Sequence, residues 1–330
     1  MAVLRAGLIG LGMMGRHHAR LLRSVEGVEL VAVADQGGDP HGVAGSLPVM
    51  SGVADLISSN LDIAVVAVPT VYHEAVCLAL AEAGVHVMVE KPLASDVASA
   101  ARIADAFARA GLVGCVGHIE RFNPALQQLR QRLAAGELGR VFQVVARRQG
   151  PFPSRIADVG VVKDLATHDI DSVSWVTGQP FSSVSARVGY MSGRKHEDLV
   201  VASASLADGT VVSLNVNWLS PFKERTLVVV GERGAFVAST LTSDLEFFAN
   251  GTVATEPDSM ISHFRGVTEG ESRRFAFSKP EPLRTEHEAF RDAVRGEDAE
   301  IVTLTQGTAI VAVAEACLES SRNGGAAVTL

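Results

Sequence analysis

The chain contains 330 residues, of which 47% are hydrophobic and 20% charged, and its net charge is −8. This composition is typical of a globular protein with two domains, and it excludes a disordered chain. Because the charge balance is acidic and the arginines are scattered, the composition also argues against a nucleic-acid partner.

The cysteines and the apolar runs indicate a cytoplasmic protein. Cys77, Cys115 and Cys317 lie far apart and have no metal-binding spacing, which is typical of a reducing compartment. No stretch reaches 18 uninterrupted apolar residues, so we expect no membrane span. The first residues are typical of a core strand rather than a signal peptide.

Residues 1–118 alternate predicted strands with predicted helices. The strands are Val3–Ile9, Leu30–Ala34, Ile63–Val68, Val85–Val89 and Val113–Gly117. One helix is expected from Val71 to Ala83, and another begins after an N-cap at Ser95 and ends at Gly111. Short apolar strands that alternate with helices predict an α/β Rossmann domain, a doubly wound parallel sheet.

A glycine-rich turn follows the first strand. Its sequence is Gly10-Leu11-Gly12-Met13-Met14-Gly15, and Asp35 closes the second strand twenty residues later. The glycines permit a tight turn and close approach of the backbone to a pyrophosphate, which the helix N-terminus then faces. The Asp35 carboxylate would accept hydrogen bonds from the ribose hydroxyls and repel a 2′-phosphate, so the pattern predicts NAD rather than NADP. The alternatives are a glycine-rich turn without a ligand and an aspartate that only ends a strand.

Polar residues follow three later strands of this domain. They include Pro69, Thr70 and His73 after one strand, Glu90, Lys91 and Pro92 after the next, and His118 after the third. Because the carboxyl ends of parallel strands share one sheet edge, we expect these residues to converge there. Lys91 is either a solvated surface lysine or an ammonium that stabilises a developing alkoxide.

Residues 119–330 form the predicted second domain, an α+β domain with an open, mostly antiparallel sheet. The strands are Val144–Arg148, Val184–Tyr190, Leu199–Leu206, Val211–Trp218, Leu227–Val230 and Ala235–Thr240, and closing helices are expected near Arg284–Val294 and Thr305–Ser321. In the strand from Val211, apolar residues alternate with Ser213, Asn215 and Asn217, so one face should be buried. An open sheet needs a cover, and a second copy of the chain is one solution.

An acid and a histidine in the second domain are candidates for proton transfer. If Asp164 to Trp175 is helical, Asp164 and His168 lie one turn apart on one face. His168 titrates near neutrality, which suits a general base, although such a pair can also be structural. His118, Asp169 and Asp171 are weaker candidates. The residues show no metal-binding motif, so we expect no metal.

Several cations lie near these segments and could bind phosphate. They are Arg147, Arg148, Arg155, Lys163, Lys223 and Arg225. Arginine binds phosphate with two parallel hydrogen bonds, which favours a phosphorylated or nucleotide-linked substrate. The alternative is a solvated strand face.

With these residues, the whole chain resembles the Gfo/Idh/MocA oxidoreductase family. The resemblance rests on the glycine turn, Ala67–His73, Glu90–Ala94 and Asp164 with His168. It implies that Lys91, Asp164 and His168 form the catalytic group, with His168 as the general acid and base. It also implies that Pro69, Thr70 and His73 lie near the nicotinamide, and that the chain forms a homodimer or homotetramer through the open sheet.

Three segments are similar to the branch of this family that includes UDP-N-acetylglucosamine 3-dehydrogenases. They are Gly117–Pro124, Arg147–Gly160 and Asn217–Lys223. The branch oxidises the sugar C3 hydroxyl to a ketone, whereas related members act on other nucleotide sugars, sugar phosphates, free sugars or inositols.

The leading hypothesis is therefore an NAD-dependent dehydrogenase of a nucleotide-linked sugar. The candidate substrate-binding residues are Lys91, His118, Arg121, Arg147, Arg155, Asp164 and His168, with Arg148 as a further candidate for the diphosphate. The alternatives are a dehydrogenase of a sugar phosphate, free sugar or inositol, and a non-catalytic NAD-binding regulator.

Overall fold

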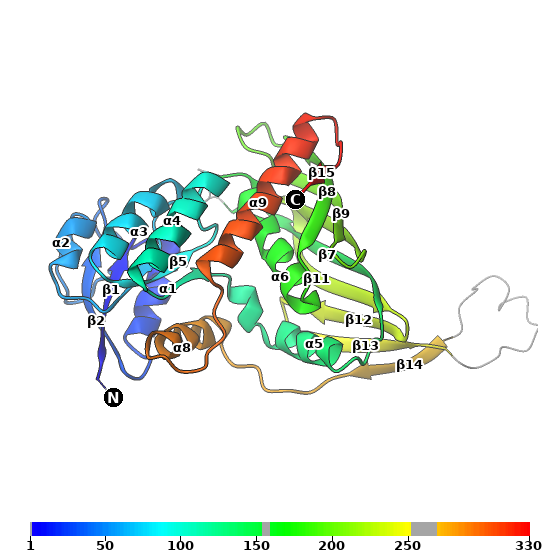
Figure 1. Ribbon diagram of the computed structural model, residues 1–330, viewed down its shortest axis with the longest axis horizontal. Helices are drawn as coiled ribbons and strands as arrows, with labels where there is room; N and C mark the ends of the chain where they lie inside the picture. Colours follow the sequence, from blue (N-terminus) through cyan, green and yellow to red (C-terminus); the bar gives the residue numbers. More distant parts are fainter. Residues whose placement is uncertain (1, 154–158, 252–268) are drawn as a thin grey trace, which may run out of the picture. The chain divides into compact units, whose positions relative to one another are not determined.

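The computed structural model describes residues 2–153, 159–251 and 269–330 (Figure 1). The chain divides into two compact units. The first contains Met1–Ile119 and Pro280–Glu315, and the second contains Glu120–Ser154, Gly160–Lys279 and Ala316–Leu330. Residues 280–315, which the sequence analysis assigned to the second domain, thus pack with the first unit. Phe290 and Val302 explain this difference, because both are buried in the apolar core of that unit.

The first unit contains a six-stranded parallel sheet. Its strands are β1 (Leu4–Ile9), β2 (Val28–Ala34), β3 (Val49–Met50), β4 (Ile63–Val66), β5 (His86–Glu90) and β6 (Gly114–Gly117). Their order is β3-β2-β1-β4-β5-β6, and each neighbouring pair is parallel. This order is that of a doubly wound dinucleotide-binding sheet, which confirms the predicted Rossmann fold. The carboxyl ends of β1 and β4 are adjacent at the point where the strand order reverses.

Helices cover both faces of this sheet (Figure 1). The helical elements of the unit are α1 (Met13–Leu22), α2 (Val53–Ile57), η1 (Thr70–Tyr72), α3 (His73–Glu82), α4 (Val97–Ala110), α8 (Pro282–Val294) and the first part of α9 (Leu304–Arg322). Leu80 of α3 and Ile103 of α4 share one apolar core with the sheet. Leu22 of α1 and Phe290 of α8 belong to a second core. The two cores explain why the strands are apolar along their whole length.

Two helix boundaries in this unit differ from the prediction. The N-cap of α4 is Asp96 rather than Ser95, because the Asp96 carboxylate accepts a hydrogen bond of 2.7 Å from the backbone N–H of Ser99. The helix predicted from Val71 begins as the single 3₁₀ turn η1, and the α-helix starts only at His73. The predicted end of α4 at Gly111 is confirmed, because Gly111 has a φ of +64°.

The second unit contains a nine-stranded sheet. Its strands are β7 (Val141–Pro151), β8 (Phe181–Gly189), β9 (Leu199–Leu206), β10 (Val211–Asn217), β11 (Leu219–Gly231), β12 (Gly234–Ser239), β13 (Asp244–Asn250), β14 (Glu269–Arg274) and β15 (Val328–Thr329). Their order is β14-β13-β12-β11-β7-β10-β9-β8-β15. The pair β10–β7 is parallel and the other pairs are antiparallel, which confirms the predicted mostly antiparallel sheet. Strands β13, β14 and β15 were not predicted from the sequence.

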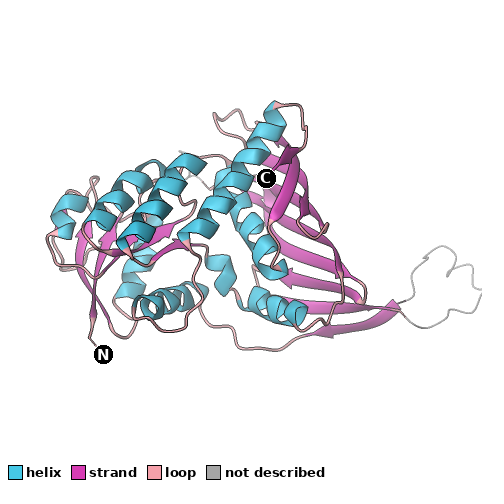
Figure 2. Cartoon of the chain, viewed as in Figure 1, coloured by secondary structure: helices cyan, strands magenta, loops and turns pink. Residues whose placement is uncertain are grey.

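Helices lie along one face of the second sheet, and in the described part of this unit the other face carries none (Figure 2). The covering elements are α5 (Pro124–Ala134), the π-helical turn η3 (Val162–Ala166), α6 (Thr167–Thr177) and the last part of α9. Along β10 the predicted alternation holds, since Leu214 is buried and Asn215 exposed. Asn217 differs because it is buried, and its amide oxygen accepts hydrogen bonds from the backbone N–H groups of Leu219 and Ser220 at the start of β11.

Candidate functional site

The glycine turn between β1 and α1 leaves no room for side chains at two positions. Gly10 has a φ of +98°, and a Cβ there would lie 2.5 Å from the backbone of Ala67. A Cβ at Gly15 would lie 2.0 Å from the Gly10 carbonyl oxygen, whereas a Cβ at Gly12 would meet nothing within 4 Å. No side chain caps the N-terminus of α1, so its first N–H groups can receive a phosphate.

Asp35 lies directly beside this turn. Its two carboxylate oxygens each accept a backbone hydrogen bond of 2.7 Å, one from Leu11 within the glycine turn and one from Gly37. The structure therefore brings together the acid and the glycines that the sequence places twenty residues apart. The partly exposed Met14 and the exposed Met13 begin α1 at the same turn.

His73 joins the ends of β4 and β5. Its ring is buried, with Nε2 3.0 Å from the Val68 carbonyl oxygen and Nδ1 3.0 Å from the Pro92 carbonyl oxygen. Thr70 is buried in η1, and Pro69 precedes that turn. His73 is predicted from the sequence to bind the cofactor, whereas the structure favours a supporting role in which it holds two strand-end loops together.

The unfolding of the chain should depend on pH through His73. Burial lowers the pKa of His73, although the hydrogen-bonded carbonyls raise it. The unfolded chain therefore binds a proton below about pH 6.5 that the folded chain does not, so stability decreases as pH falls, by at most about 1.4 kcal/mol per pH unit for one proton. We expect the melting temperature of His73→Phe to fall less than that of the wild type between pH 7.5 and 5.5. His41 is exposed, so the melting temperature of His41→Gln should change with pH as that of the wild type does. If the melting temperatures of all three proteins fell equally between pH 7.5 and 5.5, His73 would not be the source of the pH dependence.

Glu90 and Lys91 lie at the carboxyl end of β5. The Glu90 carboxylate accepts a hydrogen bond of 3.1 Å from the Lys91 backbone N–H, and its other oxygen lies 2.9 Å from His18 Nε2. Burial raises the pKa of Glu90, but His18 and Lys91 together hold it below its usual value. Glu90 is therefore a fixed negative charge beside the predicted catalytic lysine. The peptide bond from Lys91 to Pro92 is cis, and Lys91 itself is half-buried.

In the second unit, Asp164 and His168 lie on consecutive elements rather than on one α-helix. Asp164 is buried within the π-helical turn η3, and the half-buried His168 belongs to α6. The segment from Asp164 to Trp175 is therefore helical, as the prediction required, but its first turn is π-helical rather than α-helical. Single π-helical turns occur frequently at functional sites.

Glu197 explains where this π-helical turn begins, and the sequence analysis missed it. Its carboxylate accepts a hydrogen bond of 3.1 Å from the Val162 backbone N–H, and its carbonyl accepts one of 2.9 Å from Val161. A Cβ at Gly160 would lie 2.0 Å from the Glu197 carboxyl group. The buried Glu197 therefore holds the segment that carries Asp164, and no local motif around it indicates this role.

Two of the candidate arginines are buried in ion pairs. The Arg148 guanidinium is bound by Glu120 at 2.7 Å and by Asp169 at 3.0 Å, and Arg121 binds Asp171 at 2.6 Å. Burial raises the pKa of Asp169 to about 6, although Arg148 opposes the shift. This arrangement favours structural roles for Arg121, Arg148 and the two aspartates, rather than the substrate contacts and proton transfer that the sequence analysis considered.

Of the residues that the structure describes, the others predicted to bind substrate are not part of these buried ion pairs. Arg147 is exposed on the opposite side of β7 and lies 3.8 Å from Glu224. His118 is buried at the end of β6, and Arg155 lies outside the described residues. Within the described ranges, no three His, Cys, Asp or Glu side chains are arranged to hold a metal ion, and no helix is long and apolar enough to cross a bilayer.

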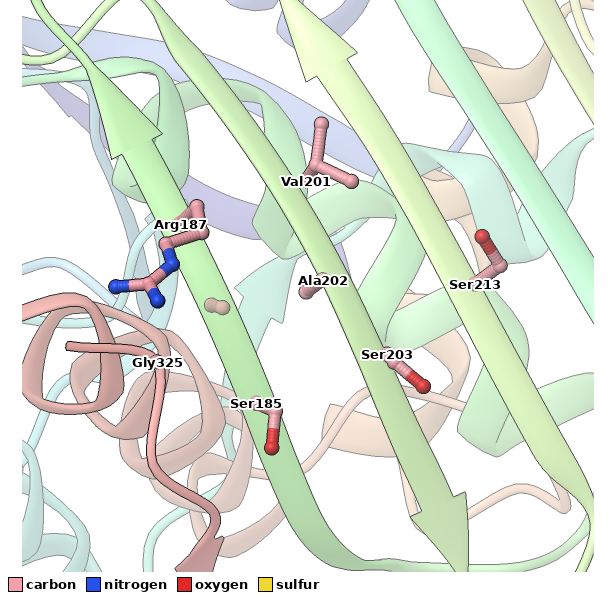
Figure 3. A pocket seen from close by; sticks show the side chains of 8 residues that line it. Ser185, Arg187, Val201, Ala202, Ser203, Ser213 and Gly325 are labelled. Atoms are coloured by element: carbon pink, nitrogen blue, oxygen red, sulfur yellow. The ribbon is translucent and has the colours of Figure 1, made fainter.

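A shallow cavity of about 290 Å³ lies on strands β8, β9 and β10 of the second sheet (Figure 3). Ser185, Arg187, Val201 and Ser213 contribute to its lining, and Figure 3 shows them on neighbouring strands. The cavity contains none of the predicted catalytic or cofactor-binding residues. It therefore does not identify the active site.

Comparisons with known proteins agree with this architecture. The family described as "Oxidoreductase family, NAD-binding Rossmann fold" matches residues 4–118, and the "GFO/IDH/MocA C-terminal domain" matches residues 126–237. Together the two regions make up more than half of the chain. The chain belongs to the Gfo/Idh/MocA family of NAD-binding oxidoreductases.

The similar proteins include relatives named as an inositol dehydrogenase and as a nucleotide-sugar dehydrogenase. Inositol 2-dehydrogenase 4 of Saccharopolyspora erythraea is 35% identical over 197 residues, which cover 56% of this chain and 57% of that protein. UDP-N-acetylglucosamine 3-dehydrogenase of Acidithiobacillus ferrooxidans is 33% identical over 213 residues, which cover 64% of this chain and 66% of that protein. A solved structure of the latter enzyme, GnnA, has a TM-score of 0.82 at 27% identity and covers 96% of both chains.

Asp35 should determine the choice between NAD and NADP. Replacing Asp35 with asparagine keeps an acceptor for a backbone N–H but removes the charge that repels a 2′-phosphate. We expect Asp35→Asn to weaken NAD binding by about tenfold and to strengthen NADP binding, since one charge contact contributes about 1.4 kcal/mol or more. Calorimetric titration with both cofactors tests this. A wild-type protein that prefers NADP, or a variant with unchanged selectivity, would contradict the role of Asp35.

Proposed function

We propose that the chain is an NAD-dependent dehydrogenase that oxidises a secondary hydroxyl group of a sugar to a ketone. The supporting observation is Lys91, which follows β5 in the NAD-binding unit and has its backbone tied to the buried Glu90 carboxylate. We further propose a nucleotide-linked sugar as substrate, oxidised at C3 as in the relative named UDP-N-acetylglucosamine 3-dehydrogenase.

In this proposal, side chains of the protein accept the hydroxyl proton and stabilise the developing negative charge. His168 takes the proton of the hydroxyl group, and the Lys91 ammonium donates a hydrogen bond to the oxygen as negative charge develops. Asp164 orients the sugar or the His168 imidazole. NAD, when bound, would supply the hydride acceptor: the oxygen loses its proton to His168, the carbinol carbon loses a hydride, and the C–O single bond becomes a carbonyl.

An uncharged polyol is a second candidate substrate, and a specific observation favours it. Arg121 and Arg148 are buried and already bound by carboxylates, which leaves their guanidinium groups committed within the fold. A diphosphate would need other cations, whereas an inositol would need none. The 35% identical relative is named as an inositol dehydrogenase.

Substrate specificity can be tested by following NADH formation at 340 nm. The compounds to compare are UDP-N-acetylglucosamine, glucose 6-phosphate, glucose, myo-inositol and scyllo-inositol. Turnover of the UDP-sugar alone would support the nucleotide-sugar proposal, and turnover of an inositol without the UDP-sugar would replace it. Tight NAD binding without turnover of any compound would favour the alternative of a non-catalytic regulator.

We also propose that the chain forms a homodimer or homotetramer in the cytoplasm. The uncovered face of the second sheet carries partly exposed apolar residues, including Val145 on β7 and Val228 on β11, which are paired in the sheet register. The three cysteines are buried free thiols, as expected in a reducing compartment. Light scattering would test the assembly, and a monomer at micromolar concentration would contradict it.

A further inference from the structure

The first unit contains a buried polar cluster that is hydrogen-bonded to the backbone of the predicted catalytic lysine, Lys91. His18 of α1 is fully buried, its Nε2 is 2.9 Å from the Glu90 carboxylate, and its Nδ1 is 2.9 Å from His287 Nε2. His287 belongs to α8 and is also buried. Neither histidine could be identified from local sequence patterns, because the cluster joins positions 18, 90 and 287.

The hydrogen-bonding groups define where one proton lies. The Glu90 carboxylate can only accept hydrogen bonds, so His18 Nε2 carries a proton and donates it. Burial lowers the pKa of His287 well below its usual value, and the neighbouring His18 lowers it further, so His287 is a neutral imidazole. The hydrogen bond between His287 Nε2 and His18 Nδ1 keeps the His18 ring oriented toward Glu90.

The cluster connects two parts of the predicted cofactor site. Glu90 uses one oxygen for His18 and the other for the Lys91 backbone N–H, so His18 is two hydrogen bonds away from the backbone of Lys91. His18 also belongs to α1, the helix that begins directly after the glycine turn. The His18 imidazole therefore connects α1 directly to Glu90.

Desolvation makes such a cluster energetically unfavourable compared with apolar side chains of similar volume. Two imidazoles and a carboxylate at this position are therefore better explained by orientation than by stability. We propose that His18 is a positioning residue, which holds Glu90 and thereby the Lys91 backbone in the geometry needed for hydride transfer. The inference rests on the proposed role of Lys91.

The test compares two replacements of His18. In His18→Gln the side-chain amide N–H can replace Nε2–H as the donor to Glu90, whereas His18→Leu fills the space without a donor. For His18→Leu we expect kcat to fall at least about twentyfold, while KM and the NADH dissociation constant change less than about threefold. His18→Gln should recover at least half of the wild-type kcat. His17→Leu, at the exposed neighbouring position on α1, serves as the matched control and should leave every parameter unchanged.

A second measurement does not depend on a substrate. Hydrogen–deuterium exchange of the peptide covering residues 86–93 should increase in His18→Leu, both without and with NAD, and should remain near wild type in His18→Gln. Glu90→Gln examines the same hydrogen bond from its other end if His18→Leu does not fold. The double variant His18→Leu with Glu90→Gln should lose less kcat than the two single losses combined, because each change weakens the same hydrogen bond between His18 and Glu90.

Several results would overturn the inference. They are wild-type kcat and exchange in His18→Leu, equal losses in the leucine and glutamine variants, or additive losses in the double variant. If the wild type turns over no sugar or polyol, the proposed function fails, and the exchange measurement alone then decides. Increased exchange in His18→Leu but not in His18→Gln would still support the positioning role, and unchanged exchange would reject it.

Discussion

Replacement of Lys91 by methionine is expected to lower kcat by about two to four orders of magnitude, while NAD affinity stays within about threefold of wild type. Methionine retains most of the side-chain length but removes the ammonium that stabilises the developing alkoxide. The Lys91 backbone N–H remains able to donate to Glu90, so the strand end should keep its conformation. Steady-state kinetics with the active substrate, together with calorimetric NAD titration, measure both effects.

A matched control distinguishes the effect of losing the Lys91 ammonium from the effect of losing a positive charge elsewhere on the protein. Lys195 is exposed in the second unit, and Lys195→Met should leave kcat and NAD binding unchanged. Wild-type turnover in Lys91→Met would show that another group stabilises the alkoxide. Loss of NAD binding in parallel with turnover would instead assign Lys91 to the cofactor.

The largest effect on stability is expected for Arg148→Met, which should lower the free energy of unfolding by about 3–5 kcal/mol. The Arg148 side chain is 3% exposed and neutralises both Glu120 and Asp169, which are themselves buried. Its removal takes away the guanidinium that is hydrogen-bonded to both carboxylates in a poorly hydrated region, and leaves the more distant charge of Arg225 near them. Urea denaturation, monitored by circular dichroism and tryptophan fluorescence, measures the change in the second unit.

The neighbouring Arg147 provides the control for this prediction. Arg147 lies on the same strand, but its side chain is 58% exposed and its ion pair with Glu224 spans 3.8 Å. Arg147→Met should therefore change stability by less than about 0.5 kcal/mol. Adding Glu120→Gln and Asp169→Asn to Arg148→Met should restore part of the lost stability, because the two carboxylate charges that Arg148 neutralised are then also removed. Equal destabilisation by the two single arginine variants would contradict the assignment of a buried ion-pair network.

The Rossmann domain could be predicted because its signals are local. Apolar strands such as Ile63–Val66 are buried on both faces, so their composition alone distinguishes them from the half-exposed strands of the second sheet. Gly10 and Asp35 could be predicted for a similar reason, since a turn with positive φ favours glycine, and an acid about twenty residues later completes the local pattern of a dinucleotide-binding domain. The capping of α5 by Asn123, followed by Pro124, is also a local signal, which the sequence analysis did not use.

The sequence by itself determined the fold class, the glycine turn with its aspartate, and the strand ends that carry the predicted cofactor-binding residues. Only the tertiary structure decided that Arg121 and Arg148 are bound by carboxylates, that Glu197 supports the turn carrying Asp164, and that His18 meets Glu90. The physical reason is range. Strand and turn preferences act over a few neighbouring residues, whereas the partner of a buried charge or imidazole is set by which distant segments the core brings together.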